Sequence, residues 1–300
     1  MQDLNEFTVT DAALEQMAGT PDPRLRQIME AAVKHLHAFA REVNLTPAEW
    51  LEGIKFLTAV GHACTPIRQE FILLSDTLGL SALVNILHDK TSTEAATQTS
   101  LLGPFYREDA PELPAGAQIV QNPGAREILV YGKVVDGDGN AIPHATVQAW
   151  QTDAEGLYDL QTHDPKSTDA RGNFRTDADG NYYFRTVRPL GYSIPTDGPG
   201  GQLAIRQGRH GMRPAHIHFL ISAPDFRELV TALYFADDEN IHSDTVFGVS
   251  QSLVVSINPQ DPACPIPGLP GVRYDFQLGR ATGGGTGRIG ADPASIVPAQ

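Results

Sequence analysis

The stretch that decides the fold is a predicted strand with a break before it, Arg213-Pro214-Ala215-His216-Ile217-His218-Phe219. Residues two apart on a strand share a face, with Cα atoms about 6.6 Å apart, because each residue rises about 3.3 Å. His216 and His218 therefore lie on one face, and Ile217 points the other way, into a core. The histidine pair fits a metal site, and it also fits two polar residues on a solvated strand face.

Other short stretches of alternating apolar residues surround this one, each bounded by turn residues. Asp136-Gly137-Asp138-Gly139-Asn140 and Asp177-Ala178-Asp179-Gly180-Asn181 are strong turn sequences. Short strands separated by Gly, Pro and Asp turns are typical of an antiparallel β-sandwich or barrel. The expected strands cover residues 127–135, 145–150, 182–187, 215–222, 229–235, 252–257 and 272–278.

The first hundred residues predict helices instead. Apolar side chains recur every three or four positions between residues 22 and 43, as in an amphipathic helix. Thr46-Pro47-Ala48-Glu49 is a capping box with proline at the first helical position, so a second helix is expected there. A third is expected over residues 66–88. The predicted fold class is mainly β with an N-terminal α-helical domain and an antiparallel β-sandwich catalytic core.

The pattern changes after Gly103-Pro104, and this change divides the chain. We expect a helical domain over residues 1–105, a β-sandwich domain over residues 106–280 and a glycine-rich tail over residues 281–300. Two cysteines, Cys64 and Cys264, are too few for a disulfide framework and are predicted to be buried thiols of a cytoplasmic protein.

The composition excludes several classes of protein. With 41% hydrophobic and 19% charged residues, the chain is globular rather than intrinsically disordered. The net charge is -14 and no cluster of Lys and Arg could neutralise phosphates, which argues against nucleic-acid binding. No apolar run approaches the roughly 18–20 residues of a membrane span, and the acidic start lacks the apolar region of a signal peptide. We therefore expect no membrane partner.

Two tyrosines lie in unusual surroundings. Tyr158 follows a predicted strand in Gly156-Leu157-Tyr158-Asp159, and Tyr192 lies in an irregular loop, Pro189-Leu190-Gly191-Tyr192-Ser193-Ile194-Pro195. On residue chemistry alone, each fits a core aromatic residue with a hydrogen-bonded hydroxyl.

The order and spacing of the two tyrosines and the histidine pair resemble those of the intradiol ring-cleavage dioxygenases. The resemblance extends over nearly the whole chain. It includes the stretches at residues 19–24, 68–79, 102–105, 156–158, 189–199, 208–210 and 213–219.

The resemblance implies one non-haem ferric ion, Fe(III), per subunit, bound by Tyr158, Tyr192, His216 and His218. Two phenolates supply negative charge that favours Fe³⁺ over Fe²⁺, and a trivalent cation favours the tyrosine anion although tyrosine has a pKa of about 10 in water. In the family, the tyrosine matching Tyr192 leaves the metal when substrate chelates and can take a substrate proton.

The resemblance also implies a catalytic arginine, Arg213, which stabilises negative charge that develops during oxygen attack. On an alternating strand Arg213 would face away from the histidines, unless Pro214 breaks the alternation. The alternative is a surface ion pair. Some family members carry glutamine or histidine at the position of Ala232, where alanine cannot form hydrogen bonds.

The family also implies the substrate, an aromatic diol or triol that reacts with O₂. The stretches at residues 71–79 and 243–249 look closer to the hydroxyquinol 1,2-dioxygenase branch, whose substrate is benzene-1,2,4-triol and whose product is 3-hydroxy-cis,cis-muconate, which tautomerises to maleylacetate. Catechol, which gives cis,cis-muconate, is the alternative, and chlorocatechols stay open. Positions that match the family's substrate pocket are Leu73, Asp76, Leu101, Leu102, Gly103, Pro104, Phe105, Ile194, Pro195, Arg213 and Val246.

Asp76 could accept a hydrogen bond from the third hydroxyl of hydroxyquinol; otherwise it pairs with Arg68 or caps a backbone N–H. The family is commonly dimeric through its N-terminal helices, sometimes with lipid in an apolar tunnel, so a homodimer is expected. Two other classes remain as alternatives. One is a non-catalytic β-sandwich binding module, and the other is a zinc hydrolase that uses His216 and His218 but lacks an evident third ligand.

Overall fold

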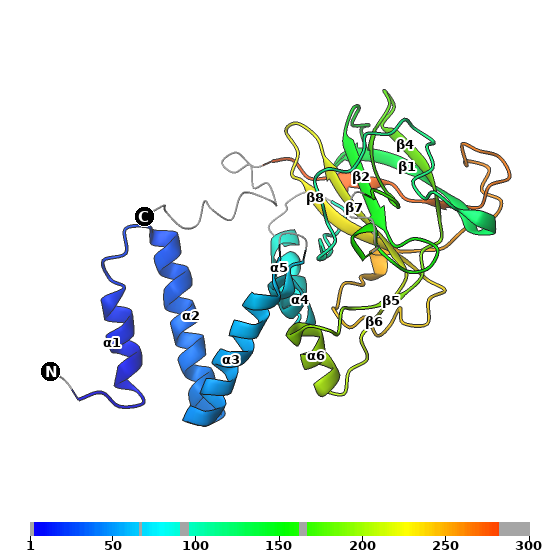
Figure 1. Ribbon diagram of the computed structural model, residues 1–300. Coiled ribbons are helices and arrows are strands. Elements are labelled where there is room, and N and C mark those ends of the chain that lie inside the picture. Colours follow the sequence, from blue (N-terminus) through cyan, green and yellow to red (C-terminus); the bar gives the residue numbers. More distant parts are fainter. Residues whose placement is uncertain (1–2, 66–67, 91–95, 162–166, 282–300) are drawn as a thin grey trace. The chain divides into compact units, whose positions relative to one another are not determined.

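The structure is a computed structural model that describes residues 3–65, 68–90, 96–161 and 167–281 (Figure 1). The chain forms two compact units, residues 1–59 and residues 60–300. In the first unit, α1 (Thr8–Gln16) packs against α2 (Pro23–Glu42). The Oγ1 atom of Thr10 lies 3.0 Å from Nδ1 of His37, and Arg41 donates to the backbone oxygen of Glu6 at 2.9 Å.

The predicted helix starts near residues 22 and 46 are confirmed. The Asp22 side chain accepts from the backbone N–H groups of Arg24 and Leu25 and so caps α2. At the next helix, α3 (Pro47–Ala63), the backbone N–H of Thr46 donates to Glu49 at 2.9 Å, and that of Glu49 donates to the Thr46 hydroxyl at 3.3 Å. This reciprocal pair is a capping box.

The prediction of one continuous third helix is wrong. The chain instead forms α4 (Glu70–Thr77) and α5 (Leu80–Asp89), bent by 76° at the break. Gly79 lies between them with a φ of 75°, a left-handed conformation that glycine adopts readily and that ends α4. Pro66, the predicted start, lies outside the described residues. Among the described helices none is long and apolar enough alone to cross a membrane, and only this bent pair meets those criteria when its helices are joined.

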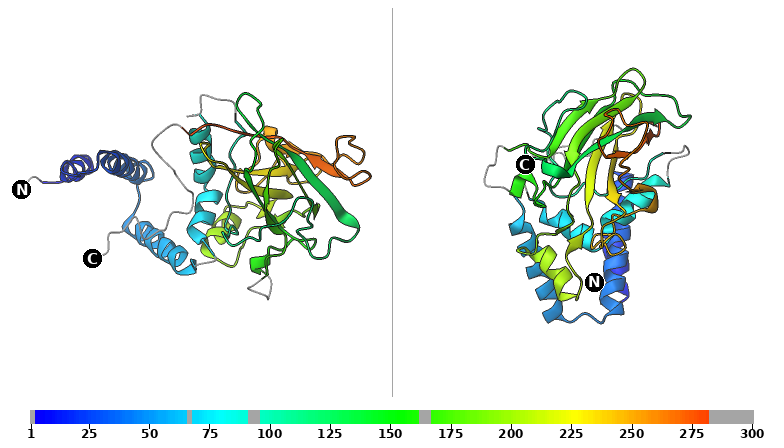
Figure 2. Two further views of the ribbon diagram at one scale, coloured as in Figure 1. Left: turned by 90° about the horizontal axis from the view of Figure 1, so that it is seen from above. Right: turned by 90° about the vertical axis from the view of Figure 1, so that its right-hand side faces the viewer.

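The second unit contains two large β-sheets that lie face to face, together with a short two-stranded sheet (Figures 1 and 2). In the first, β1 (Glu127–Asp136) pairs antiparallel with β4 (Asn181–Val187) and parallel with β10 (Gly271–Arg273) and β11 (Phe276–Leu278). The second sheet has the order β3 (Arg171–Arg175), β2 (Thr146–Gln151), β7 (His216–Ser222), β8 (Leu229–Phe235) and β9 (Val254–Val255). Its pairs are antiparallel except β8 with β9.

The predicted fold class, a β core with N-terminal helices, is therefore confirmed, with short parallel pairs added at the sheet edges. The stretch expected as one strand over residues 272–278 is divided into β10 and β11, and that expected over residues 252–257 is only β9, preceded by the 3₁₀ turn η3 (Gln251–Leu253). The structure also contains η1 (Gly124–Arg126), η2 (Asp159–Gln161), β5 (Tyr192–Ser193), α6 (Pro199–Arg206) and β6 (Met212–Arg213).

The main core lies between the two sheets. The Phe219 ring from β7 lies 6.3 Å from that of Phe184 on β4 and 4.9 Å from that of Phe276 on β11. Ile217 and Ile221 share this core with Phe219. Because strand residues alternate, His216 and His218 lie on the opposite face of the sheet.

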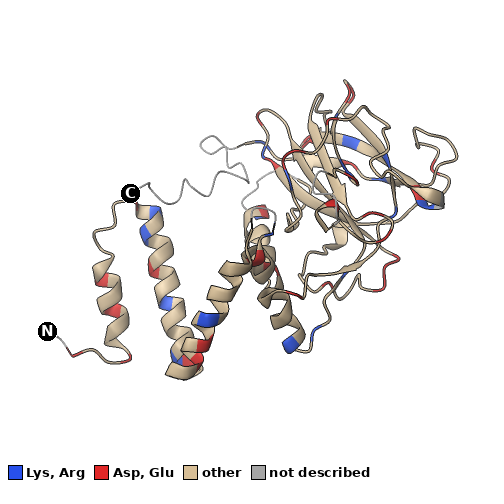
Figure 3. Cartoon of the chain, viewed as in Figure 1, with Lys and Arg blue, Asp and Glu red and all other residues tan. Residues whose placement is uncertain are grey.

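The remaining expectations concern the two cysteines, the distribution of charge and the domain boundaries. Cys64 and Cys264 carry free thiols but are half-buried rather than buried, since one lies just after α3 and the other in a loop. Lys and Arg are interspersed with Asp and Glu along the chain (Figure 3). The domain division at residue 105 stays a prediction, and the tail over residues 281–300 lies outside the described residues apart from Ala281.

Candidate active site

The two histidines of β7 converge on one point. Their Nε2 atoms are 3.1 Å apart, and both side chains are buried. Nδ1 of His216 lies 2.6 Å from the backbone oxygen of Pro214, which can accept only if Nδ1 carries the proton. This contact directs the unprotonated Nε2 of His216 toward His218.

The two tyrosines reach the same point from other segments. Tyr158 follows β2, and its hydroxyl lies 3.5 Å from Nε2 of His216. Tyr192 belongs to β5, and its ring centroid is 5.4 Å from that of Tyr158 and 5.6 Å from that of His216. The structure thus brings all four predicted ligands together, from three separate stretches of chain.

Burial sets the protonation of these groups. It lowers the pKa of His216 well below its usual value, and the charge of Arg213 lowers it further. It also lowers the pKa of His218, with smaller contributions from His216 and Arg213. For Tyr158, burial and the neighbouring Tyr192 hydroxyl raise the pKa well above 10.0. The imidazoles are therefore neutral, with lone pairs available, and the phenol needs a nearby cation to ionise.

The usual metal-binding side chains in proteins are those of His, Cys, Asp and Glu. Within the described ranges, no group of three or more His, Cys, Asp or Glu side chains could hold a metal ion. Among these residues, a site built on His216 and His218 therefore depends on the tyrosines, and the zinc hydrolase alternative has no third His, Cys, Asp or Glu ligand there.

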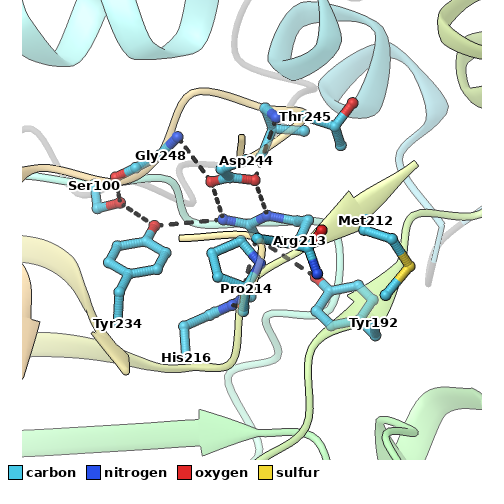
Figure 4. Close-up of polar contacts among 12 residues, drawn as sticks. Ser100, Tyr192, Met212, Arg213, Pro214, His216, Tyr234, Asp244, Thr245 and Gly248 are labelled. Atoms are coloured by element: carbon cyan, nitrogen blue, oxygen red, sulfur yellow. Dashed lines mark hydrogen bonds and ion pairs between the residues drawn. The ribbon is translucent and has the colours of Figure 1, made fainter. Parts of the chain in front are cut away.

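Arg213 faces this cluster, because β6 ends at Arg213, β7 begins at His216, and Pro214 between them breaks the alternation. One terminal nitrogen, NH1, lies 3.2 Å from Nε2 of His216 and 3.5 Å from the Tyr192 hydroxyl (Figure 4). The alternative of a surface ion pair is wrong. The Arg213 side chain is 3% exposed and pairs with the buried Asp244 at 3.2 Å.

Comparisons with known proteins identify the family of this chain. The family model described as "Dioxygenase" matches residues 101–280, and the one described as "Catechol dioxygenase N terminus" matches residues 22–96. The chain belongs to the intradiol ring-cleavage dioxygenases. It is therefore an enzyme, an oxidoreductase of aromatic hydrocarbon catabolism, in a family that depends on non-haem iron.

Individual relatives of this dioxygenase cover most of its length. It is 44% identical over 254 residues to 6-chlorohydroxyquinol 1,2-dioxygenase of Cupriavidus pinatubonensis, covering 85% of this chain and 92% of that protein. It is 42% identical to hydroxyquinol 1,2-dioxygenase of Nocardioides simplex, covering 93% and 97%. Among solved structures, hydroxyquinol 1,2-dioxygenase from Pseudomonas putida superposes with a TM-score of 0.82 at 41% identity, covering 92% of this chain and 99% of that one.

Seven of the predicted pocket residues of the dioxygenase form two overlapping groups. Four of them pack together with Ala204 in one apolar cluster, namely Leu73, Leu101, Ile194 and Val246. Leu73, Pro104, Phe105 and Pro195 line a cavity of about 490 Å³. Leu102 packs against the aromatic cluster that contains Phe105 and Tyr158, whose rings stack with centroids 4.3 Å apart.

Gly103, another predicted pocket residue, lies against the His218 ring. Its φ is 75°, and a Cβ placed there would lie 3.3 Å from the His218 ring. Glycine both permits this backbone conformation and leaves the imidazole room.

Asp76 is buried on α4. It is not among the described residues that line the cavity. Burial raises its pKa; a hydrogen bond from Ser81 and the charge of Arg213 oppose this, and Asp244 adds to it. The alternative pairing with Arg68 is wrong, because Arg68 pairs with Glu70 at 2.9 Å and with Asp197 at 2.7 Å.

Sequence reasoning missed several residues around the site. The indole of Trp150 stacks on His218, and Asp244 and Tyr234 contact Arg213. The buried Asp159, next to Tyr158, forms an ion pair with Arg171. Only Trp150 carried a sequence signal, since it ends a predicted strand that could pair with the one bearing the histidines.

Proposed function

We propose that this dioxygenase opens the ring of hydroxyquinol, benzene-1,2,4-triol, between two neighbouring hydroxylated carbons. One O₂ adds both atoms to the substrate, C₆H₆O₃, and gives 3-hydroxy-cis,cis-muconate, C₆H₆O₅, which tautomerises to maleylacetate. The substrate assignment rests on the 40–44% identity, over most of the chain, to enzymes named hydroxyquinol or 6-chlorohydroxyquinol 1,2-dioxygenases. Catechol is a second candidate, because a catechol 1,2-dioxygenase of Candida albicans is 36% identical.

The donor atoms fit one ferric ion per subunit. The Nε2 atoms of His216 and His218 lie 3.1 Å apart, close enough for both to bind one ion. The Tyr158 hydroxyl adjoins this pair, and the Tyr192 ring lies beside both Tyr158 and His216. When bound, ferric iron would hold the diol as its dianion and make the ring electron-rich toward O₂.

The protein groups then have distinct tasks. Tyr158, His216 and His218 are the proposed permanent ligands, and all three are buried in regular or tightly packed structure. Tyr192 lies on the two-residue strand β5, which pairs only with the equally short β6 among the described strands. We assign to the Tyr192 oxygen the role of taking a proton from the substrate.

Arg213 supplies positive charge where the ring becomes negative. Its guanidinium is buried, so its field is screened little by water. Burial by itself lowers the pKa of Arg213. The Asp244 carboxylate outweighs burial and raises this pKa above its ordinary value, so the guanidinium stays charged.

We assign to Asp76 the enzyme's preference for a substrate with a third hydroxyl group. Its carboxyl group is buried on α4, three residues after the pocket residue Leu73, and is within electrostatic range of Arg213. A hydroxyl on the substrate could bond to it, whereas catechol offers no such group. Ser81 already donates to this carboxyl group, so the substrate hydroxyl would add a further hydrogen bond, worth about 0.5–1.5 kcal/mol.

We also propose a homodimer through the N-terminal helices, with lipid as a further ligand there. Apolar side chains of α2 are exposed, including Leu25 at 49%, Leu36 at 65% and Phe39 at 52%. A second copy would cover them. Sedimentation at micromolar concentration should give a dimer, and a monomer would contradict this. Organic extraction followed by mass spectrometry tests for lipid.

The substrate is tested by measuring kcat/KM for hydroxyquinol and catechol with the iron-loaded enzyme, followed by product analysis under ¹⁸O₂. We expect the higher kcat/KM with hydroxyquinol and two labelled oxygens in maleylacetate. Faster cleavage of catechol would overturn the substrate assignment but leave the class of reaction intact. A product with one labelled oxygen or none would overturn the reaction.

A further inference from the structure

The guanidinium of Arg213 is held on two of its three nitrogens. Nε donates to Oδ1 of Asp244 at 3.2 Å, and NH2 donates to Oδ2 of Asp244 and to the Tyr234 hydroxyl, both at 3.3 Å. The third nitrogen, NH1, points to His216 and Tyr192 (Figure 4). The two holding residues thus leave one edge of the guanidinium to face the candidate site.

These contacts belong to a closed ring of hydrogen bonds. The Ser100 hydroxyl has one proton, which it donates to the backbone oxygen of Gly248 at 3.1 Å. The Tyr234 hydroxyl, 2.8 Å away, therefore donates to Ser100, and its oxygen accepts from Arg213. The backbone N–H of Gly248 completes the ring by donating to Oδ2 of Asp244 at 3.0 Å. Each donor in the ring has an acceptor, which favours a single orientation of the guanidinium.

Asp244 also holds the pocket wall. Its Oδ1 accepts from the backbone N–H of Val246 at 3.3 Å, and the Val246 side chain belongs to the apolar cluster with Leu73 and Ile194. One carboxylate is therefore bonded both to the guanidinium and to the backbone of a predicted substrate contact.

The ring is also tightly packed at Gly248. A Cβ there would lie 2.5 Å from the Tyr234 hydroxyl and 3.0 Å from NH2 of Arg213. A methyl group would therefore displace Tyr234, Arg213 or both without removing any hydrogen-bonding group.

We propose that Asp244 is a positioning residue that orients Arg213 toward the reacting ring and fixes this orientation relative to the pocket wall at Val246. The proposal rests on the proposed function, in which Arg213 stabilises charge in the transition state. Asp244 itself contacts neither the four predicted ligands nor, in this account, the substrate.

The test uses the iron-loaded enzyme and Asp244→Asn. Asparagine keeps the shape of the aspartate side chain. Its N–H₂ group, however, would face an N–H donor of Gly248 or Arg213 and could not accept from it. We expect kcat per bound iron to fall about 10- to 100-fold, with KM within about threefold, because a misdirected charge weakens transition-state stabilisation more than binding. Iron content and colour should stay near those of the wild type. The matched control is Asp237→Asn, which alters the exposed ion pair with Arg188 and should leave kcat unchanged.

A double-mutant cycle separates positioning from a merely structural role. In an Arg213→Met background, Asp244→Asn should change kcat less than about twofold, because the residue it orients is gone. A similar loss of kcat in both backgrounds, or an Asp244→Asn enzyme within twofold of wild type, would overturn the proposal.

A second variant covers the case in which Asp244→Asn does not fold or hold iron. Gly248→Ala should reproduce the kcat loss, and Arg213→Met should again abolish its effect. Unchanged kcat in Gly248→Ala would overturn the proposal in that case. A wild type that cleaves neither hydroxyquinol nor catechol would instead defeat the proposed function, so the two failures are distinguishable.

Discussion

The indole ring of Trp150 lies parallel to the imidazole ring of His218, with centroids 5.0 Å apart and planes inclined by 7°. The two residues are direct partners in the register of β2 and β7. Side chains that face each other across antiparallel strands share a face of the sheet. The β2–β7 pairing therefore sets the ring plane of a predicted metal ligand.

Trp150→Ala should destabilise the protein and loosen its hold on iron. Loss of a buried tryptophan costs about 3–5 kcal/mol, and His218 would lose the ring that fixes its plane. Urea unfolding and iron content after dialysis against a chelator measure the two effects. Trp150→Phe keeps an aromatic ring and should retain more iron. Equal iron retention in the alanine, phenylalanine and wild-type proteins would show that the stack does not matter.

Asp76→Ala should narrow the preference for hydroxyquinol over catechol. One further hydrogen bond worth about 0.5–1.5 kcal/mol corresponds to about 2- to 13-fold in the ratio of the two kcat/KM values. The variant should lose mainly hydroxyquinol turnover. Glu52→Ala, which removes an exposed carboxylate of α3 paired with Lys55, is the comparison, and its ratio should stay near that of the wild type. An unchanged ratio in Asp76→Ala would remove Asp76 from the substrate assignment.

The iron-free protein should lose stability as the pH falls below 6.5. Burial, aided by neighbouring positive charge, holds the pKa values of His216 and His218 well below the ordinary 6.5. The unfolded chain then binds more protons than the folded one, so the free energy of unfolding falls on acidification. The slope is at most about 1.4 kcal/mol per pH unit for each histidine.

Urea unfolding between pH 7 and pH 5 measures this slope. The raised pKa of Asp76 acts in the opposite sense, since there the folded state binds the extra proton. Comparison with a His216→Asn/His218→Asn variant isolates the histidine contribution. The variant should show the flatter profile, and identical profiles would contradict the assigned protonation.

The sequence allowed the local features of the site to be predicted, but not the long-range ones. Alternation along one strand placed His216 and His218 on one face, and the Thr46–Glu49 capping box predicted the start of α3. Both depend on neighbours in the chain. The direction of the Arg213 side chain was ambiguous, because a proline can break the alternation along a strand or leave it intact.

The contacts of Arg213 could not be predicted from pattern at all. Asp244 lies 31 residues from Arg213, and Ser100 lies 134 residues from Tyr234. The break at Gly79 was missed for another reason: apolar residues continue on both sides of it, so periodicity alone favoured one helix. Family resemblance supplied the tyrosine ligands, which residue chemistry by itself assigned to the core.

The four-residue metal centre is the central claim, and the most direct test is the iron content and visible spectrum of Tyr158→Phe, Tyr192→Phe and His216→Ala beside the wild type. Tyrosinate-to-Fe³⁺ charge transfer should make the wild type red-purple. Tyr158→Phe and His216→Ala should lose iron and colour, because each removes one of four protein ligands. Tyr192→Phe should keep more iron, with a shifted absorption band. Stoichiometric ferric iron with an unchanged spectrum in all three variants would contradict the account.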